Sequence, residues 1–410
     1  MATERLFLVS DPALIRDVFV THNQRFHKGR GLEKSKRLLG NGLLTSEDEF
    51  HLRQRRLIQP AFHRDRIASF ADTMTAIADR VQAGWTGGAE LDLATEMSRL
   101  TLLIVGKTLF DVDVEAQASD VGDAMTGLSE SFWTLMLPFS EVLERLPIPR
   151  LRRARRARER LDAVIYGIIN ERRASGADRG DLLSMLLLAQ DAEDHGRRMT
   201  DIQVRDEAMT LFLAGHETTA NALTWTWHLL GHAPDVDRRL HDELDAVLGG
   251  RLPTMADVER LPYTTRVVTE SMRLYPPAWL VGRRAVEATR LGDYDVPVRS
   301  IVVISQWVVH RDARHYPDPE RFDPDRWTPE FRAHLPRFAY FPFGGGPRQC
   351  IGESFAWMEL VLVLATLAQR WRFEPVAGHP VVPHAVVTLR PKYGMKMTAC
   401  SRQLAAGSRQ

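Results

Sequence analysis

The spacing of apolar positions predicts helices over most of the first two thirds of the chain. Between residues 65 and 82, apolar side chains recur at helical spacing, namely at Ile67, Phe70, Met74, Ile77 and Val81. Similar periodicity predicts helices over residues 151–174, 181–190 and 234–250. Together these segments predict a helical body from about residue 48 to residue 275.

A long helix is expected in the middle of this body. Thr200 and Asp201 are suited to capping its start, and the apolar pattern continues to about Gly231, with Pro234 just beyond. About 30 helical residues at 1.5 Å each would span about 45 Å, the width of a domain. This helix is therefore expected to run through the core.

The pattern changes after Pro276 and Pro277. Residues 276–342 are expected to be β-rich and irregular, because alternation over residues 291–304 predicts short strands and residues 310–342 are rich in Pro, Asp and aromatic side chains. A glycine-rich loop (343–352), a helix (to about residue 371) and a β-like tail (385–400) follow. The predicted fold class is mainly α with a small β part, in one domain over residues 1–410.

Composition narrows the class of protein. The chain has 410 residues, a net charge of +1 and an ordinary globular composition of 44% hydrophobic and 26% charged residues. Balanced charge favours neither nucleic acid nor an anionic membrane as a partner, and no apolar run approaches the roughly 18 residues of a membrane span. Two cysteines, Cys350 and Cys400, are too few for a disulfide framework or an all-cysteine zinc site and are typical of a reducing compartment. We expect a cytoplasmic protein of enzyme size.

One charge cluster interrupts this balance, because seven of the eleven residues from 150 to 160 are Arg. Nucleic-acid binding is one interpretation. A solvated helix face is favoured, since no aromatic side chains are interleaved with the arginines.

The glycine-rich segment from Phe343 to Gly352 carries the candidate chemistry. Its glycines allow a tight turn and close backbone approach, and Cys350 stands just before a helix, where backbone amides favour a thiolate. A dinucleotide loop would need glycine where Gln349 stands. A nucleophilic cysteine would need a His–Asn or His–Asp partner, which the sequence does not single out. The third interpretation is a metal-bound thiolate, and a lone cysteine suits haem iron better than zinc.

This segment resembles the haem-binding loop of cytochromes P450 at Phe343, Gly344, Arg348, Cys350 and Gly352. Three further motifs occur in that family's order. Residues 270–273 match its Glu-x-x-Arg, residues 322–327 match the segment that supplies a second arginine, and residues 214–219 (Ala-Gly-His-Glu-Thr-Thr) match its oxygen-activation motif. The resemblance implies the triangular helical body of a cytochrome P450 around a haem b.

The resemblance assigns the metal ligand and the catalytic pair. Cys350 would be the proximal iron ligand, whereas Cys400, which lacks such a loop, would be an inert cysteine. Thr218 would hydrogen-bond dioxygen and its waters, and Glu217 would relay protons. Ala214 would allow close approach of the flat cofactor. The neighbouring residues His216 and Thr219 are expected to be structural.

Further residues are assigned to structural and cofactor-binding roles. The resemblance implies that Glu270, Arg273 and Arg326 form a buried network that positions the haem loop. Four basic residues would face the haem propionates: His51 and Arg55, which share a helix face, together with Arg283 and Arg348. Arg284, next to Arg283, is an alternative for the third position.

The implied activity is that of a haem-thiolate monooxygenase. It would use O2 and two electrons to hydroxylate or epoxidise a lipophilic small molecule of the fatty acid, terpenoid or polyketide type. The electrons would come from a ferredoxin and an NAD(P)H-dependent ferredoxin reductase, and the protein would be a monomer. The alternatives are a peroxide-using peroxygenase, which typically lacks the Glu–Thr pair, an isomerase, a non-catalytic haem sensor, and an arginine-rich scaffold without haem.

Two expectations concern the ends of the chain and the substrate. Residues 1–30 resemble the strand and helix that normally follow a proline-rich leader, so the leader is expected to be missing, and no fused reductase is expected after Cys350. Substrate selectivity is expected in residues 29–44, 128–138, 277–281 and 386–390, whose apolar content favours a lipophilic ligand.

Overall fold

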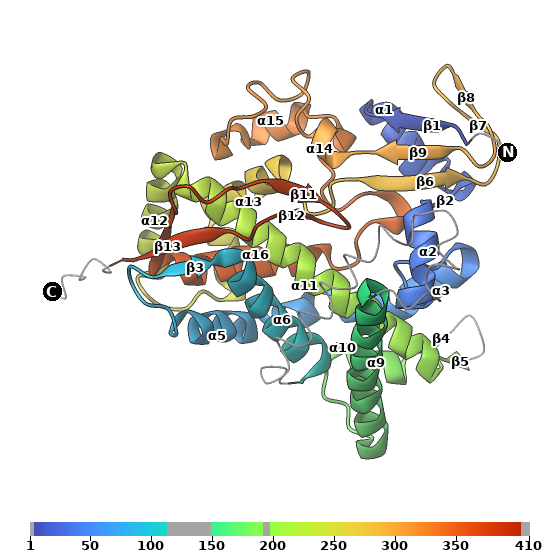
Figure 1. The fold of residues 1–410 in the computed structure, drawn as a ribbon, viewed down its shortest axis with the longest axis horizontal. Coiled ribbons are helices and arrows are strands. Elements are labelled where there is room, and N and C mark those ends of the chain that lie inside the picture. Colours follow the sequence, from blue (N-terminus) through green and yellow to red (C-terminus); the bar gives the residue numbers. More distant parts are fainter. Residues whose placement is uncertain (1–3, 113–148, 192–196, 403–410) are drawn as a thin grey trace.

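The structure is a computed structural model that describes residues 4–112, 149–191 and 197–402. Helices dominate it (Figure 1). Their bounds are α1 Pro12–Arg16, α2 Arg30–Leu39, α3 Asp48–Ile58, α4 Arg64–Ala68, α5 Ala71–Gln82, α6 Leu93–Phe110, α9 Pro149–Ser175, α10 Leu182–Leu188, α11 Asp201–Gly231, α12 Pro234–Leu248, α13 Pro262–Leu274, α14 Gln306–Val309, α15 Pro329–His334 and α16 Glu353–Ala368. The predicted class, mainly α with a small β part, is confirmed.

The strands are short and form small sheets. They are β1 Leu6–Val9, β2 Phe26–Lys28, β3 Glu90–Asp92, β4 Gln190–Asp191, β5 Arg197–Arg198, β6 Val281–Ala285, β7 Thr289–Leu291, β8 Tyr294–Val296, β9 Ile301–Ile304, β10 Trp371–Pro375, β11 Pro383–Ala385, β12 Leu389–Pro391 and β13 Lys396–Ser401. The largest sheet has the order β1-β9-β6-β2, with β1 parallel to β9, so it joins the start of the chain to residues 281–304. A second sheet, β10-β13-β3, pairs the strands near the end of the chain with β3, the strand that directly precedes α6.

The long predicted helix is α11, and it crosses the middle of the molecule (Figure 1). The Thr200 hydroxyl accepts a hydrogen bond from the Gln203 amide, and the Gln203 side chain accepts one from the Thr200 amide, which forms a capping box. Most of its residues are buried, including Trp225 and Trp227, because α6, α13, α16 and α9 pack around it. Burial on several sides explains why α11 has no single polar face.

Several predicted element boundaries are confirmed and two are wrong. The helices α9, α10, α11 and α12 and the strands β7 to β9 lie where the apolar pattern placed them. The predicted helix over residues 65–82 is instead two helices, because the Ser69 hydroxyl bonds to the Arg66 carbonyl and ends the first of them. The helix predicted to reach residue 371 ends at Ala368. Trp371 begins β10, where its ring meets that of Trp85 at 5.9 Å.

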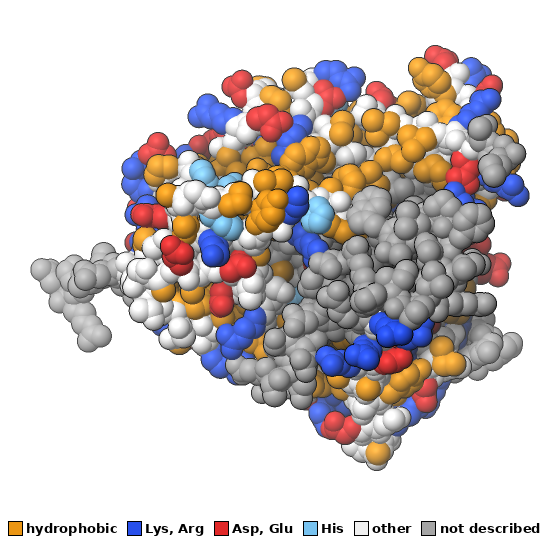
Figure 2. Space-filling view, viewed as in Figure 1, with side chains coloured by type: hydrophobic (Ala, Val, Ile, Leu, Met, Phe, Trp, Pro, Cys, Tyr) orange, Lys and Arg blue, Asp and Glu red, His pale blue; other side chains and the backbone are white. Residues whose placement is uncertain are grey.

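On the visible face of the described surface, acidic and basic side chains are mixed (Figure 2). Basic side chains gather over α9, where Arg152, Arg155, Arg156 and Arg160 are exposed. This placement agrees with a solvated helix face for part of the arginine cluster. Within the described ranges, every helix is too short or too polar to cross a membrane.

Candidate functional site

The glycine-rich loop before α16 folds back on itself and presents Cys350 at its end. The Cys350 amide donates to the Phe343 carbonyl at 3.0 Å, and the Phe343 ring packs against Trp357 at 5.6 Å. Gly346 has a φ of +69°, and a Cβ there would lie 1.9 Å from the Phe19 carbonyl oxygen, so only glycine fits. Gly344 also has a positive φ, of +74°. The loop geometry therefore requires glycine at positions 344 and 346.

Cys350 is exposed by its surface area, although protein atoms surround its thiol on most sides. Burial raises the pKa of this thiol to about 11, although the Gly352 backbone N–H and the Arg55 charge oppose the rise. The backbone amide thus favours the thiolate as expected, but in the protein alone the desolvation of the thiol outweighs it. A bound metal cation would reverse this balance, since a coordinating thiol loses its proton.

A cluster of buried and partly buried basic side chains lies close to this loop, and we call Lys28, His51, Arg283 and Arg348 the basic cluster. Lys28, which the sequence did not single out, is 6% exposed, and its ammonium donates to the Leu43 and Ser46 carbonyls at 2.7 and 2.6 Å. Burial, reinforced by the nearby arginines, lowers the pKa of Lys28 to about 7 and that of Arg283 to about 10.

The acidic residue among them is Glu47. It forms an ion pair with Arg348 and accepts a hydrogen bond from the Lys28 amide at 2.7 Å. One carboxylate cannot neutralise the cations of the basic cluster. Buried charge without a counter-charge is costly, so the arrangement favours an additional anionic group.

His51 supplies a second sign that a ligand belongs here. Burial lowers the pKa of His51 to about 3, helped by Lys28, so its ring is neutral. Its Nδ1 atom lies 3.3 Å from the Ser46 hydroxyl, whereas its buried Nε2 atom has no hydrogen-bond partner among the described residues. Buried polar atoms are nearly always paired. The two carboxylates of a haem would supply both the missing negative charge and a partner for Nε2.

The structure also separates the two candidate strand arginines. Arg283 is 7% exposed and is close enough to Arg348 and Glu47 for their charges to affect its pKa. Arg284 points elsewhere and pairs with Glu33 at 3.3 Å near the surface. Arg55, predicted to face the propionates, donates to the Gln349 carbonyl at 2.8 Å and so holds the residue next to Cys350.

The predicted oxygen-activation segment lies in the middle of α11. Ala214 is exposed although the helix around it is largely buried, and its carbonyl accepts a hydrogen bond from the Thr218 hydroxyl at 2.7 Å. Glu217 accepts a hydrogen bond from the Thr388 hydroxyl at 2.6 Å. His216 bonds to Ser98 at 2.8 Å, and burial lowers its pKa to about 4, which suits the structural role expected for it.

The helix that follows the glycine-rich loop packs against the helix that carries the oxygen-activation segment. α16 begins three residues after Cys350 and packs against α11, where Glu359 meets Thr219. Glu359 is fully buried, and burial raises its pKa well above the usual range, opposed by the Thr219 hydroxyl. This contact places the helix that follows Cys350 against the residue next to Thr218.

The residues Glu270, Arg273 and Arg326 meet in a buried network. Arg273 donates to both Glu270 carboxylate oxygens at 2.8 Å, and Arg326 donates to one of them at 2.9 Å. The Trp327 ring and the Asp323 amide add donors at 2.9 and 3.0 Å. Arg273 also donates to backbone carbonyls of the segment that leads to the glycine-rich loop. The carboxylate thus ties α13 to that segment.

A second buried carboxylate holds the loop between α2 and α3, which includes part of the predicted substrate segment 29–44. Glu207 on α11 accepts from the Leu43 amide at 2.8 Å and from Gln54 at 2.9 Å. The neighbouring Asp206 accepts from the Asn41 amide at 2.7 Å and from Arg205 at 2.8 Å. These bonds fix the loop to the central helix.

Glu207 should make stability depend on pH. Burial raises its pKa to about 7, against the hydrogen bonds from Leu43 and Gln54. The folded protein then keeps this proton, whereas the unfolded chain releases it near pH 4.5, so stability is lost as the pH rises from about 4.5 to 7. We expect the free energy of unfolding of the wild type to fall by up to about 3 kcal/mol relative to Glu207→Gln over this range. Denaturant titrations of both proteins at several pH values would measure this change. A difference in unfolding free energy between them that does not vary with pH would contradict the assignment.

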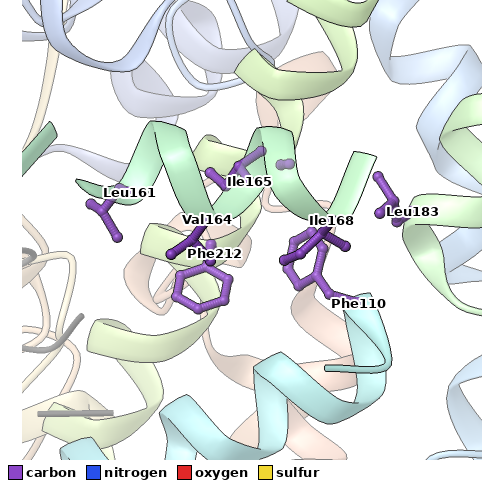
Figure 3. A pocket seen from close by; sticks show the side chains of 8 residues that line it. Phe110, Leu161, Val164, Ile165, Ile168, Leu183 and Phe212 are labelled. Atoms are coloured by element: carbon purple, nitrogen blue, oxygen red, sulfur yellow. The ribbon is translucent and has the colours of Figure 1, made fainter. Parts of the chain in front are cut away.

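An apolar pocket lies elsewhere, between α6, α9, α10 and α11 (Figure 3). Phe110, Ile165, Leu183 and Phe212 are among the side chains that line it. Its volume is about 10 Å³, which is room for about one water molecule. It is a packing gap and not a site for a haem or a substrate. The predicted substrate segment 128–138 lies outside the described residues.

No set of three His, Cys, Asp or Glu side chains in the described parts of the chain could hold a metal ion. A metal bound by Cys350 would therefore need further ligands from a cofactor, which a haem provides. The profile of the cytochrome P450 family matches residues 1–397. The chain is a cytochrome P450. The cofactor of this family is a haem iron, and the chain is accordingly an oxidoreductase of the monooxygenase type.

Individual relatives of this cytochrome P450 are similar over nearly its whole length. Cyclooctatin synthase of Streptomyces melanosporofaciens is 43% identical over 386 residues, which cover 94% of this chain and 84% of the relative. Cyclooctat-9-en-7-ol 5-monooxygenase of the same organism is 40% identical, covering 92% and 82%. The solved structure of retinoic acid bound cyanobacterial CYP120A1 superposes with a TM-score of 0.89 at 26% identity, covering 97% and 90%.

Four residues near this P450 site were not singled out from the sequence, namely Lys28, Glu47, Glu207 and Thr388, although Thr388 lies within the predicted substrate segment 386–390. Each lies outside the recognised motifs, and its role depends on contacts with distant segments. One weak sequence signal pointed to Lys28. It is a charged residue at the end of the short strand β2, in a position where an apolar side chain would be expected.

Proposed function

We propose that this cytochrome P450 is a haem-thiolate monooxygenase that oxygenates a lipophilic, terpenoid-like substrate. The observation that carries the proposal is the pairing of a deep, accessible Cys350 thiol with the basic cluster and its unpartnered His51 Nε2 atom. This combination suits a ligand that carries both a metal and two carboxylates. Haem b has both, and its covalent attachment is not expected, because the chain has only two cysteines, fifty residues apart.

Each residue has a proposed task. Cys350 would hold the iron as a thiolate, and His51, Arg283 and Arg348 would bind the propionates together with Lys28. When bound, the haem supplies the redox chemistry that splits dioxygen. Thr218 and Glu217 would hold and pass protons on the α11 side, while Ala214 leaves room for the cofactor. Arg55, Phe343, Gly344 and Gly352 would shape the loop around Cys350.

The proposed substrate class rests on the names of the relatives and on the apolar residues of the predicted substrate segments. Cyclooctat-9-en-7-ol is by its name a cyclic hydrocarbon alcohol, and the relative is named for oxygenating it at position 5. In this chain, the segment 277–281 presents Leu280 at 37% exposure, and Trp279 donates to the Val386 carbonyl at 3.3 Å, so two predicted substrate segments meet. We therefore narrow the lipophilic classes to terpenoid-like cyclic hydrocarbons.

The proposal also covers the oligomeric state of the protein, its cellular compartment and its source of electrons. The chain is proposed as a single haem domain that acts as a monomer in the cytoplasm, where two free cysteines are compatible with reducing conditions. Electrons would come from a ferredoxin and its NAD(P)H-dependent reductase. Electrostatic complementarity with such a partner would make turnover sensitive to ionic strength.

The direct test is oxygenation of a cyclic terpene by the haem-reconstituted protein with ferredoxin, reductase and NADH under ¹⁸O2. We expect a product that carries one labelled oxygen atom and depends on NADH. The same product formed from hydrogen peroxide alone, without ferredoxin, would instead support a peroxygenase. Haem binding with no product under either condition, across a panel of terpenes, would support a non-catalytic haem protein.

A further inference from the structure

The turn between β11 and β12 is bound to three successive turns of α11. Glu217, Asn221 and Trp225 are spaced by four residues and so share one face of the helix. The Thr388 hydroxyl donates to Glu217 Oε1 at 2.6 Å and accepts from Asn221 Nδ2 at 3.1 Å. The Trp225 indole donates to the Leu389 carbonyl at 3.0 Å. The three side chains hold one short stretch of the turn.

The direction of the hydrogen bonds follows from the groups involved. A hydroxyl has one proton, and a side-chain amide nitrogen can only donate. The bonds therefore run from Asn221 to Thr388 and from Thr388 to Glu217. Thr388 and Asn221 are 6% and 7% exposed, so water competes little for these groups. Asn221 occupies the acceptor side of the hydroxyl and leaves its proton for Glu217.

The same turn belongs to a segment predicted to face the substrate. The Leu389 amide donates to the Pro277 carbonyl at 2.9 Å, and Trp279 donates to the Val386 carbonyl at 3.3 Å. Residues 277–281 and 386–390 are thus joined to each other and, through Thr388, to Glu217. Glu217, the carboxylate proposed to relay protons, is therefore hydrogen-bonded to a residue of a segment proposed to contact substrate.

We propose that Thr388, oriented by Asn221, is a positioning residue that holds the Glu217 carboxylate in the orientation from which it relays protons. This inference rests on the proposed monooxygenase function. Coupled turnover consumes RH, O2, two electrons and two protons and gives ROH and water. When protons are delivered wrongly, the same O2, electrons and protons leave as hydrogen peroxide. Loss of the Thr388 hydroxyl therefore diverts electrons from product to peroxide.

The test compares Thr388→Val, which keeps the shape but removes the hydroxyl, with Thr388→Ser, which restores it. Thr108→Val is the matched control, because Thr108 is also buried and its hydroxyl, among the described residues, bonds only to the Ile104 carbonyl at 2.7 Å. We expect several-fold more peroxide per NADH and a larger solvent isotope effect in Thr388→Val. Thr388→Ser and Thr108→Val should behave as the wild type does.

A second readout does not require turnover. The infrared band of the Glu217 carboxylate, assigned by subtraction of a Glu217→Gln spectrum, should shift in resting Thr388→Val and return in Thr388→Ser. If Thr388→Val does not fold, Asn221→Ala should shift the band and raise peroxide release in the same direction, because the hydroxyl then loses its orientation.

The two proposals can fail separately. If the wild type makes no oxygenated product, the proposed function fails, while the infrared comparison still tests the hydrogen bond. If the wild type oxygenates its substrate and Thr388→Val matches Thr108→Val in peroxide release, isotope effect and infrared band, the positioning role of Thr388 is overturned.

Discussion

Replacement of Arg273 by methionine should destabilise the protein by about 3–5 kcal/mol, the usual cost of removing one partner of a buried ion pair. Arg273 and Glu270 are both fully buried, and the arginine donates to both carboxylate oxygens at 2.8 Å. Without the Arg273 side chain, Glu270 loses two of its hydrogen-bond donors. The carbonyls of His310 and Pro319 also lose the hydrogen bonds that Arg273 donates to them. Chemical denaturation of the haem-loaded protein, followed by circular dichroism, would measure the change.

Arg238→Met is the matched control for this experiment. Arg238 pairs with Asp235 at the same i, i+3 type of spacing, but the two side chains are 66% and 84% exposed. An exposed pair of this kind contributes about 0–1 kcal/mol. Equal losses of stability in Arg238→Met and Arg273→Met would contradict the account of a buried network.

The second large effect is expected at Cys350. Cys350→Ala should abolish NADH-dependent oxygenation, because the proposed thiolate ligand, which donates electron density to favour O–O cleavage, is removed. Cys400→Ala is the control: Cys400 lies in β13, where it pairs across the sheet with Arg372, and its sulfur bonds weakly to the Thr398 carbonyl. Product formation by mass spectrometry would compare the two. Oxygenation retained in Cys350→Ala, or lost in Cys400→Ala, would contradict the assignment.

The features that the sequence predicted well are local. The start of α11 could be predicted because Thr200 and Gln203 form its capping box within one helical turn. The glycine-rich loop could be recognised because its positive φ angles at Gly344 and Gly346 require glycine in a short, contiguous motif. Such signals depend on neighbours in the chain, so one sequence suffices to recognise them.

The features that it missed depend on distant segments. Lys28 becomes a buried cation because β2, the start of α3 and the loop before α16 meet around it. Thr388 meets Glu217 across 171 residues. The raised pKa of Cys350 was missed for the same reason, since the amide effect is local whereas the burial that outweighs it comes from the whole fold. Periodicity and motifs carry no information on such contacts.

The central claim, that Cys350 binds haem iron as a thiolate, is tested most directly by the reduced carbon monoxide difference spectrum of the haem-loaded wild type. The account predicts an absorption band at the position characteristic of thiolate-ligated haem, and its loss in Cys350→Ala but not in Cys400→Ala. A band at the position of an imidazole-ligated or neutral-ligand haem in the freshly prepared wild type would contradict it, as would a thiolate band that survives in Cys350→Ala.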